Sequence, residues 1–475
     1  MGQNLNRLLQ ECAGQFENVP AFMYLDNRTV REVHFGEFYE NVQRRRAYYG
    51  RLAQKRVGVW AYNSYEWIVA VTALLLAGKT AILLDANLPD EDMLKLCEYT
   101  DVQLLMNDEE TAESEAAQRM PAILLSDEGE EAGGKEKTEE EERDGAFICF
   151  TSGTSRSAKG VVITVETLCG CVRDYREVVI GEKGQRFYLP LPYHHIYAFV
   201  YIYHLLHMGG VQCIGRTGRH IIPDLAAMRP QVMFVVPSML KYLLEKDWIP
   251  ESVQTVLSGG SYLRQELAEA VERKGVELRN LYGSSEVLGA VACSAREKGL
   301  QWLRPVGSNR FIRNEDGELG IILPHHMKEY YHKPEDTAQI LDNKRHIFWT
   351  GDAGDMDADG FVCIRGRVRD MIVLENGEKV HAEDTDGQLC ALPGVRDGAV
   401  IGADGTLVAV VIPDDGVSEE ALMQTVKRYN RTRQTAIRFQ DLWIRREPFP
   451  RTTIGKLKRF ILEQEYRKEK GGQSK

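Results

Sequence analysis

The sequence has no long hydrophobic run and no excess of basic residues. Its longest apolar stretch, Trp67 to Leu76 with one threonine, is too short to span a lipid bilayer. Its first six residues begin no apolar signal core and contain no myristoylation site. The net charge of -11 at pH 7 disfavours nucleic acid as a partner, because a nucleic-acid-binding chain is expected to carry a basic surface. We therefore expect a cytoplasmic protein with no transmembrane segment and no nucleic-acid partner, which binds small anions through local positive groups.

Paired cysteines are also missing. The nine cysteines are odd in number and scattered, and none forms a Cys-x-x-Cys pair. This pattern is typical of reduced thiols in a cytosolic protein. The 475 residues, 43% of them hydrophobic, are enough for two or three domains with a sizeable core, and they exclude global disorder.

Strand-like and helix-like segments alternate along much of the chain. Over residues 56–106 the pattern predicts strand, helix, strand, helix, strand, an order that is typical of a parallel α/β sheet. The predicted strands are 57–61, 80–84 and 102–106, and the predicted helices are 66–78 and 90–100. After Gly160 the alternation returns, with strands at 231–237, 253–257 and 277–281 and a helix at 263–273.

Three further segments complete the predicted organisation. Residues 127–144 are acidic and contain almost nothing apolar, so we expect a solvated, mobile loop. Residues 307–364 consist of short strand and turn patterns, which predict a small β region. We therefore predict an α/β fold with a large N-terminal domain, residues 1–367, of parallel-rich sheets and helices with this β region. A small, mobile α+β C-terminal domain would follow at residues 368–475.

One segment has the composition of a phosphate-binding loop. A buried-looking run at 146–150 leads into residues 151–160, and a second run at 161–164 leaves them. Glycine lets backbone N–H groups approach an anion, serine and threonine add donors, and Lys159 adds a positive charge. The GxxxxGK[ST] spacing of a Walker loop is absent. The alternative interpretation is a polar hairpin between two strands.

Two more segments combine aromatic and polar residues. Residues 189–199 hold the paired histidines His194 and His195 among dense aromatics, which indicates either a pocket wall or a well-packed loop and helix start. Residues 281–286 place Tyr282 and Glu286 directly after a strand. The ring could stack on a base, and the carboxylate could hold Mg²⁺ beside phosphates. The alternative is a turn at a strand end.

The last two segments carry an aspartate and a lysine. Asp352 is followed by Asp355, Asp357 and Asp359, but the EF-hand pattern fails because its central glycine and closing glutamate are missing. A turn-rich hairpin with one functional aspartate is the better interpretation. In residues 449–456, Lys456 lies on a glycine-containing turn, from which it could reach a neighbouring cleft as a mobile charge. The alternative is an exposed surface lysine.

Taken in order, these five segments resemble the adenylate-forming (AMP-binding) superfamily, which includes acyl-CoA synthetases, peptide-synthetase adenylation domains and beetle luciferases. The resemblance extends from roughly residue 15 to residue 465. Residues 366–380 are similar to the signature of the fatty acyl-CoA synthetases. Members of the superfamily join a carboxylic acid to AMP, release pyrophosphate and pass the acyl group to a thiol. The resemblance therefore implies an acyl-CoA synthetase that uses ATP, Mg²⁺ and coenzyme A.

The resemblance also implies a role for each site residue. The phosphate loop would contain Thr151, Ser152, Gly153, Thr154, Ser155, Lys159 and Gly160. The rest of the ATP site would comprise Gly259, Gly260, Ser261, Tyr282, Gly283, Ser285, Asp352 and Arg367. In it, Tyr282 would stack on the adenine, and Asp352 and Arg367 would bind the ribose. The catalytic residues would be Lys456, Glu286, which would also hold Mg²⁺, and His195 near the acyl carboxylate. Arg369 would be the hinge, and Asn376 and Gly377 would belong to the loop on the coenzyme A side.

Two departures from the family pattern bear on activity. Arg156 stands where the phosphate loop usually has glycine, and Ala158 stands where it usually has proline. Arg156 adds charge but restricts the backbone, so a non-catalytic nucleotide-binding or acyl-binding relative is one alternative. Because Lys159, Lys456, Glu286, Asp352 and Arg367 are all present, we favour an active enzyme.

The sequence says less about the carboxylic acid substrate and about the thiol that accepts the acyl group. Residues 198–204 contain no carboxylate that would pair with a substrate amine, which weighs against an amino acid and favours a fatty or aryl acid. We expect Tyr197, Phe199 and Tyr201 to line its pocket, although such aromatics can equally be core. Coenzyme A is the expected acceptor, and the alternative is the phosphopantetheine of an acyl carrier protein.

Overall fold

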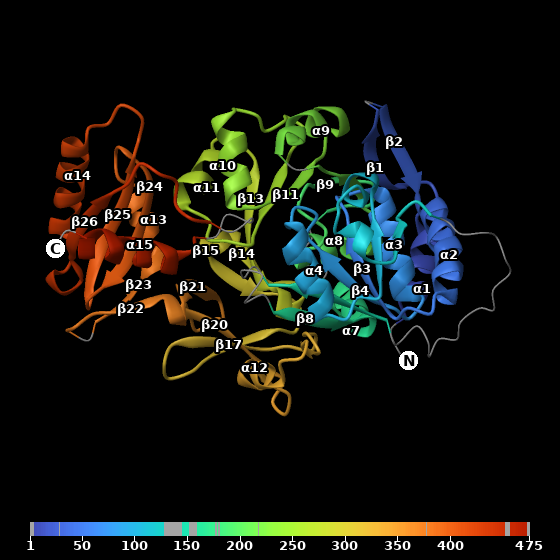
Figure 1. The fold of residues 1–475 in the computed structure, drawn as a ribbon. Helices are drawn as coiled ribbons and strands as arrows, with labels where there is room; N and C mark the ends of the chain where they lie inside the picture. Colours follow the sequence, from blue (N-terminus) through green and yellow to red (C-terminus); the bar gives the residue numbers. More distant parts are fainter. Residues whose placement is uncertain are drawn as a thin grey trace.

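The computed structural model describes residues 4–27, 29–127, 145–151, 159–175, 178, 181–216, 218–376, 378–451 and 457–472. The chain has a mixed α/β fold, with a large N-terminal part followed by a separate, smaller C-terminal part (Figure 1). This arrangement confirms the predicted fold class. The domain boundary at residue 367 and the mobility of the smaller part stay predictions. The acidic segment predicted at 127–144 lies, apart from Asp127, outside the described residues.

A seven-stranded sheet contains the first predicted strands, in the order β18-β8-β7-β4-β3-β5-β6. Strands β7, β4, β3, β5 and β6 are parallel, which confirms the parallel α/β pattern predicted over residues 56–106. Strands β8 and β18 are antiparallel to their neighbours. The bounds are β3, Arg56–Trp60; β4, Thr80–Leu84; β5, Leu104–Asn107; β6, Ala122–Leu124; β7, Ala146–Phe150; β8, Gly160–Thr164; and β18, Glu329–Tyr330.

A second, fourteen-stranded sheet changes from parallel to antiparallel at β13. Strands β1, β10, β9, β11, β12 and β13 are parallel, and the pairs from β13 to β21 are antiparallel. The bounds are β1, Pro20–Asp26; β2, Thr29–His34; β9, Arg186–Leu189; β10, Val211–Ile214; β11, Val232–Val235; β12, Thr255–Ser258; β13, Glu277–Ser284; β14, Gly289–Ala295; β15, Gly299–Pro305; β16, Arg310–Arg313; β17, Glu318–Ile322; β19, Leu341–Asp342; β20, Ile347–Met356; and β21, Val362–Arg367. The later strands are the predicted small β region.

Strands β20 and β21 form the hairpin predicted around the aspartate cluster. Asp355 forms an ion pair with Arg365 at 2.8 Å, and both Asp357 and Asp359 form ion pairs with Lys298. The chain's own cations therefore neutralise these carboxylates. Within the described ranges, no group of three or more histidine, cysteine, aspartate or glutamate side chains could hold a metal ion.

Two helices that are buried on nearly every face lie between the large sheets. Helices α3, Tyr65–Leu76, and α8, Ile196–Met208, contact each other through Trp67 and Phe199, whose ring centroids are 5.9 Å apart. Such helices are apolar all round because no face meets solvent. The other α-helices among the described residues of the large part are α1, Leu5–Gln15; α2, Phe35–Arg51; α4, Asp90–Tyr99; α5, Glu109–Ala112; α7, Val165–Asp174; α9, Ile221–Met228; α10, Pro237–Glu245; α11, Gln265–Glu272; and α12, Pro334–Ile340. No helix in the described part of the chain is long and apolar enough to cross a membrane.

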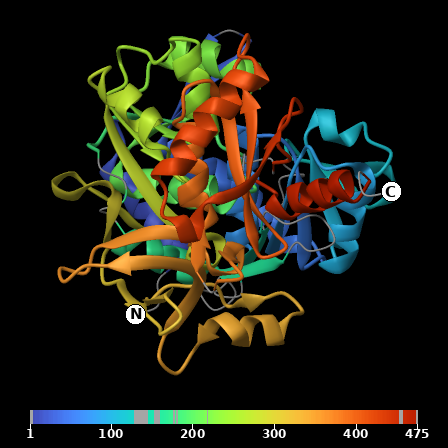
Figure 2. The same cartoon turned by 90° about the vertical axis from the view of Figure 1, so that its left-hand side faces the viewer.

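The C-terminal part is a three-stranded sheet covered by helices on both faces. Alternate residues of β25 point to opposite cores: Leu407 and Ala409 pack toward α13 and α14, whereas Val408 and Val410 pack toward α15. Figure 2 shows this part, in orange and red, in front of the large part. The bounds are β22, Met371–Val373; β23, Lys379–His381; α13, Ala382–Cys390; β24, Val395–Ala403; β25, Thr406–Pro413; α14, Glu419–Thr432; β26, Phe439–Ile444; and α15, Arg459–Gly472.

One ion-pair cluster joins the two parts. Arg264, at the N-terminus of α11, donates to Asp397 on β24 at 3.0 Å. Arg451 of the C-terminal part donates to the other oxygen of Asp397 at 2.6 Å. Because Asp397 keeps Arg451 when Arg264 is removed, the contact between the parts can be tested without leaving a buried charge unpaired.

We expect Arg264→Met to weaken the contact between the parts without unfolding either one. Loss of a partly exposed ion pair of this kind shifts the equilibrium between the docked and undocked parts by roughly two- to fivefold. Limited trypsin digestion should therefore cut about two- to fivefold faster at the exposed Arg369, in the short helix Val368–Asp370 that joins the parts. The matched control is Arg273→Met, because Arg273 ends the same helix but pairs with Glu269 within it. Equal digestion of both variants would contradict the expectation.

Candidate active site

A cavity of about 740 Å³ lies between the two parts of the chain and collects most of the described site residues. The predicted residues that line it are Thr151, Lys159, His195, Gly259, Gly260, Gly283, Ser285, Glu286, Arg367 and Arg369. Segments that are far apart in the sequence thus converge on one site. Gly160, Ser261, Tyr282, Asp352 and Asn376 are not among its lining residues, and Tyr282 and Asp352 lie directly behind Arg367.

The two ends of the predicted phosphate loop are fixed to each other. The Thr151 N–H donates to the Lys159 carbonyl at 3.1 Å, and the Lys159 N–H donates to the Thr151 hydroxyl at 3.3 Å. These bonds continue the antiparallel pair of β7 and β8. Ser152, Gly153, Thr154 and Ser155 lie outside the described residues, as do Arg156 and Ala158, so the phosphate-binding role of this loop stays a prediction.

Lys159 and Glu286 are connected through Tyr330. The Lys159 ammonium lies 3.0 Å from an Asp336 oxygen and 4.7 Å from the centre of the Tyr330 ring. The Tyr330 hydroxyl donates to Glu286 at 2.5 Å. Burial, together with the Glu286 carboxylate, raises the pKa of Tyr330, so it remains a hydrogen-bond donor at neutral pH. Sequence analysis missed Tyr330 and Asp336, because only the pairing of β18 with β8 brings them to the site.

A glycine-dependent turn positions Ser285 and Glu286. A Cβ atom added to Gly283 would lie 1.6 Å from the Gly289 carbonyl oxygen, so only glycine fits where β13 meets β14. Glu286 follows in the short helix Ser285–Val287, and its carbonyl accepts from the Met327 N–H at 2.6 Å. Ser284 lines the same cavity, and its buried hydroxyl has no hydrogen-bond partner in the described part of the chain.

Arg367 is held by Asp352 at the cavity wall. Its Nε atom lies 2.9 Å from one Asp352 oxygen, and the Tyr282 hydroxyl donates to the other at 2.5 Å. Arg367 also donates to the Thr350 carbonyl at 2.9 Å. Burial lowers the pKa of Arg367, but the effect of the neighbouring Asp352, Tyr282 and Glu286 is larger and raises the pKa overall. Arg367 therefore stays protonated. Burial also raises the pKa of Tyr282 well above its ordinary value.

His195 caps the N-terminus of α8 and is neutral. Its Nδ1 atom accepts from the Tyr197 N–H at 3.3 Å, which places the ring proton on Nε2. Burial, and then the neighbouring His194, lowers the pKa of His195 to about 4. His195 therefore offers the cavity a hydrogen-bond donor without a charge.

Of the three aromatics predicted to line an acyl pocket, only Tyr197 lines the cavity. Phe199 packs against Phe147 with ring centroids 4.4 Å apart, and Tyr201 packs against Phe234 at 4.7 Å. Both are fully buried between the two sheets, so they form core rather than a pocket wall. This corrects the prediction at those two positions, because a helix buried all round presents only its first turn to the cavity.

The C-terminal part closes the cavity with residues that sequence analysis had not singled out. Leu457, Lys458 and Phe460 line it together with Arg369 and Asp370. Phe460 is 53% exposed, which is unusual for a phenylalanine, but this exposure is visible only in the structure. Lys456 and Gly377 lie outside the described residues. Asn376 is exposed and does not line the cavity.

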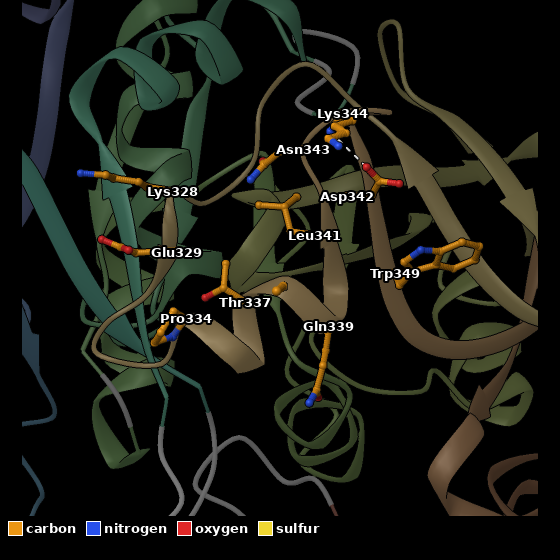
Figure 3. Close-up of a pocket in the computed structure, with 11 residues that line it drawn as sticks. Lys328, Glu329, Pro334, Thr337, Gln339, Leu341, Asp342, Asn343, Lys344 and Trp349 are labelled. Carbon is orange, nitrogen blue, oxygen red and sulfur yellow. Dashed lines mark hydrogen bonds between the residues drawn. The ribbon is translucent and has the colours of Figure 1, made fainter.

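A second pocket, of about 640 Å³, lies on the small β region (Figure 3). Residues of α12 and of the following strands line it, including Thr337, Asp342, Lys344 and Trp349. None of the predicted site residues lies there. Helix α12 therefore borders this pocket, while its Asp336 contacts the lysine of the main cavity.

The sequence belongs to the AMP-binding enzyme family. Residues 9–331 match the AMP-binding enzyme family, and residues 369–469 match the AMP-binding enzyme C-terminal domain. A long-chain-fatty-acid–CoA ligase of Mycobacterium tuberculosis is 26% identical over 74% of this chain and 72% of the relative. A 2-succinylbenzoate–CoA ligase of Bacillus velezensis is 26% identical over 74% of this chain and 75% of the relative.

The fold is also that of a solved ligase. The o-succinylbenzoate CoA synthetase of Bacillus subtilis, in complex with its acyl-adenylate intermediate, has a TM-score of 0.82 and 22% identity, with 98% of both chains covered. The same enzyme solved with ATP and a magnesium ion has a TM-score of 0.80 and 22% identity, with 95% of this chain and 98% of that chain covered. These similar proteins are AMP-forming acyl-CoA or aryl-CoA ligases.

The buried histidine makes folding sensitive to acid. The pKa of His195 is lower in the folded chain than in the unfolded chain, so between about pH 6.5 and 4 the unfolded chain binds a proton at this residue and the folded chain does not. The free energy of unfolding therefore decreases as the pH falls through this range. We expect His195→Gln to reduce the loss of stability between pH 7 and pH 5 by about 1–2 kcal/mol. Urea denaturation at both pH values measures it, with His34→Gln, on an exposed histidine, as the control. An unchanged pH dependence in His195→Gln would contradict the expected neutral state.

Proposed function

We propose that this protein is an ATP-dependent carboxylic acid–thiol ligase, which forms an acyl-adenylate and then an acyl thioester. The observation that carries the proposal is the convergence of Lys159, Glu286 and Arg367 on one cavity in a chain of the AMP-binding enzyme family. The relatives, which act on fatty, succinylbenzoate and malonate substrates, support a CoA ligase and leave the acid open.

The chemistry needs positive charge where two anions meet. In the first half-reaction a carboxylate oxygen attacks the α-phosphorus of ATP, and pyrophosphate leaves. Lys159 would bind the terminal phosphates, Arg367 with Asp352 would hold the ribose, and Lys456 would approach the reacting groups. Lys456 is followed directly by Leu457 and Lys458, both of which line the cavity, and this supports its assignment. The neutral His195 would donate from Nε2 to the acyl carboxylate.

The residues present fit a magnesium ion. Mg²⁺ in nucleotide sites usually takes one or two carboxylates and completes its shell with phosphate oxygens and water. Glu286 supplies one carboxylate at the cavity, oriented by the Tyr330 hydroxyl. When bound, the ion would neutralise charge on the phosphate oxygens.

The proposed acid is apolar. Tyr197 and the glycines Gly259 and Gly260 form a small, uncharged part of the wall beside His195, and helix α8 contains no carboxylate. A fatty or aryl acid suits this wall better than an amino acid, whose amine would need a counter-ion. Coenzyme A is the proposed acceptor, and the phosphopantetheine of a carrier protein is the alternative.

The test is pyrophosphate release from Mg²⁺-ATP over a panel of fatty, aryl and amino acids, with and without coenzyme A. We expect release with at least one apolar acid and acceleration by coenzyme A. Release without acceleration would favour a carrier-protein acceptor, and release with amino acids alone would contradict the proposed acid. Binding of ATP with no release from any acid would favour a non-catalytic relative.

Asp352→Ala should raise the KM for ATP by about tenfold or more, because Arg367 would lose the partner that fixes it at the cavity wall. Asp355→Ala is the matched control, since Asp355 lies on the same strand but pairs with Arg365 away from the cavity. Steady-state kinetics with the best acid of the panel measures both. A KM for ATP that rises equally in the two variants would show that the effect comes from the hairpin rather than from the site.

A further inference from the structure

The cavity lysine already has an anionic partner from its own chain. The Lys159 ammonium lies 3.0 Å from the Asp336 carboxylate, and both side chains are 34% exposed. This ammonium also lies over the Tyr330 ring. The Lys159 ammonium holds the pKa of Asp336 below its ordinary value, so the carboxylate is ionised at neutral pH. A phosphate that binds Lys159 therefore meets a site whose charge is already neutralised.

The backbone fixes Asp336 in this place. The Tyr331 N–H donates to the Gly160 carbonyl at 2.7 Å, next to Lys159, and the Lys328 N–H donates to the Val162 carbonyl at 2.8 Å. The Tyr330 N–H donates to the Thr337 hydroxyl at 2.9 Å. The first two bonds tie β18 to β8, and the third ties the first turn of α12 to β18. Asp336 and Lys159 are thus brought together by the sheet rather than by two freely moving side chains.

We propose that Asp336 is an internal counter-ion of Lys159, which the terminal phosphates of a nucleoside triphosphate must displace in order to bind. This inference rests on the proposed function, because it assumes that the triphosphate enters this cavity. Tyr330 does not compete with the ligand: its ring stays under the ammonium and its hydroxyl stays on Glu286. Displacement of Asp336 therefore frees the charge of Lys159 without moving the lysine away from Glu286.

The competition has a consequence for turnover. The terminal phosphates carry more negative charge than one carboxylate and form stronger charge-assisted hydrogen bonds. They therefore replace Asp336 as the partner of Lys159. The return of Asp336 to Lys159 then favours departure of the pyrophosphate that the reaction leaves behind. Asp336 would therefore weaken the binding of both ATP and pyrophosphate, and it acts as a positioning residue for Lys159 rather than as a catalytic one.

The test is equilibrium binding of ATP and of inorganic pyrophosphate, in the absence of an acid, to the full chain and to Asp336→Asn. Isothermal titration should give dissociation constants about two- to fivefold lower in the variant, the range expected when a partly exposed ion pair no longer competes. Glu335→Gln is the matched control, because Glu335 is the exposed neighbour on the same helix and its loss changes the net charge equally. It should leave both dissociation constants unchanged.

The decisive arm repeats the substitution without the lysine. In a Lys159→Ala background, Asp336→Asn should no longer tighten binding, because the two residues act as a pair. Weaker or unchanged binding in Asp336→Asn, equal tightening in Glu335→Gln, or tightening that persists without Lys159 would overturn the proposal. If Asp336→Asn does not fold, Asp336→Ser serves in the same cycle. A wild-type chain that binds neither ATP nor pyrophosphate would instead refute the proposed function.

Discussion

The addition of the two-residue strand β18 to β8 is the interaction on which the site depends. It places Tyr330 beside Val161, immediately after the predicted phosphate loop. From that position the Tyr330 ring contacts Lys159 and its hydroxyl contacts Glu286, so one side chain links this cation of the cavity to this carboxylate. Glu286 is fixed from the other side by the turn at Gly283, where no Cβ atom fits. Two backbone constraints thus position the charges that an AMP-forming reaction would use.

Two cations of the site, Lys159 and Arg367, are already paired within the chain. Lys159 is paired with Asp336, and Arg367 is paired with Asp352, which also accepts from Tyr282. The neighbouring His195 is neutral because burial lowers its pKa. Such pairing holds side chains in place before a ligand arrives, so less ordering is needed on binding. At Lys159, the proposed exchange means that an anionic ligand would replace the Asp336 carboxylate rather than fill an uncompensated positive site.

Sequence reasoning predicted the fold class well and the site less completely. The strand at residues 80–84 and the run at 146–150 match β4 and β7, because strands buried on both faces are written as short apolar runs. Glu286 could be proposed because it follows a predicted strand as a carboxylate beside hydroxyl residues, whereas Arg367 was implied by the family resemblance. Tyr330 and Asp336 could not, since only a long-range strand pairing brings them to Lys159. Phe199 was misassigned because an aromatic residue on a fully buried helix looks the same in sequence whether it packs in the core or lines a pocket.

The central claim is that this cavity joins a carboxylic acid to AMP. The most direct measurement is exchange of labelled pyrophosphate into ATP, which reports reversible adenylation whether or not an acceptor thiol is present. The account predicts exchange that depends on an apolar acid and that is lost in Glu286→Gln, while ATP still binds. Exchange that proceeds at the same rate without Glu286 would contradict the assignment of this cavity. So would firm ATP binding with no exchange for any fatty, aryl or amino acid.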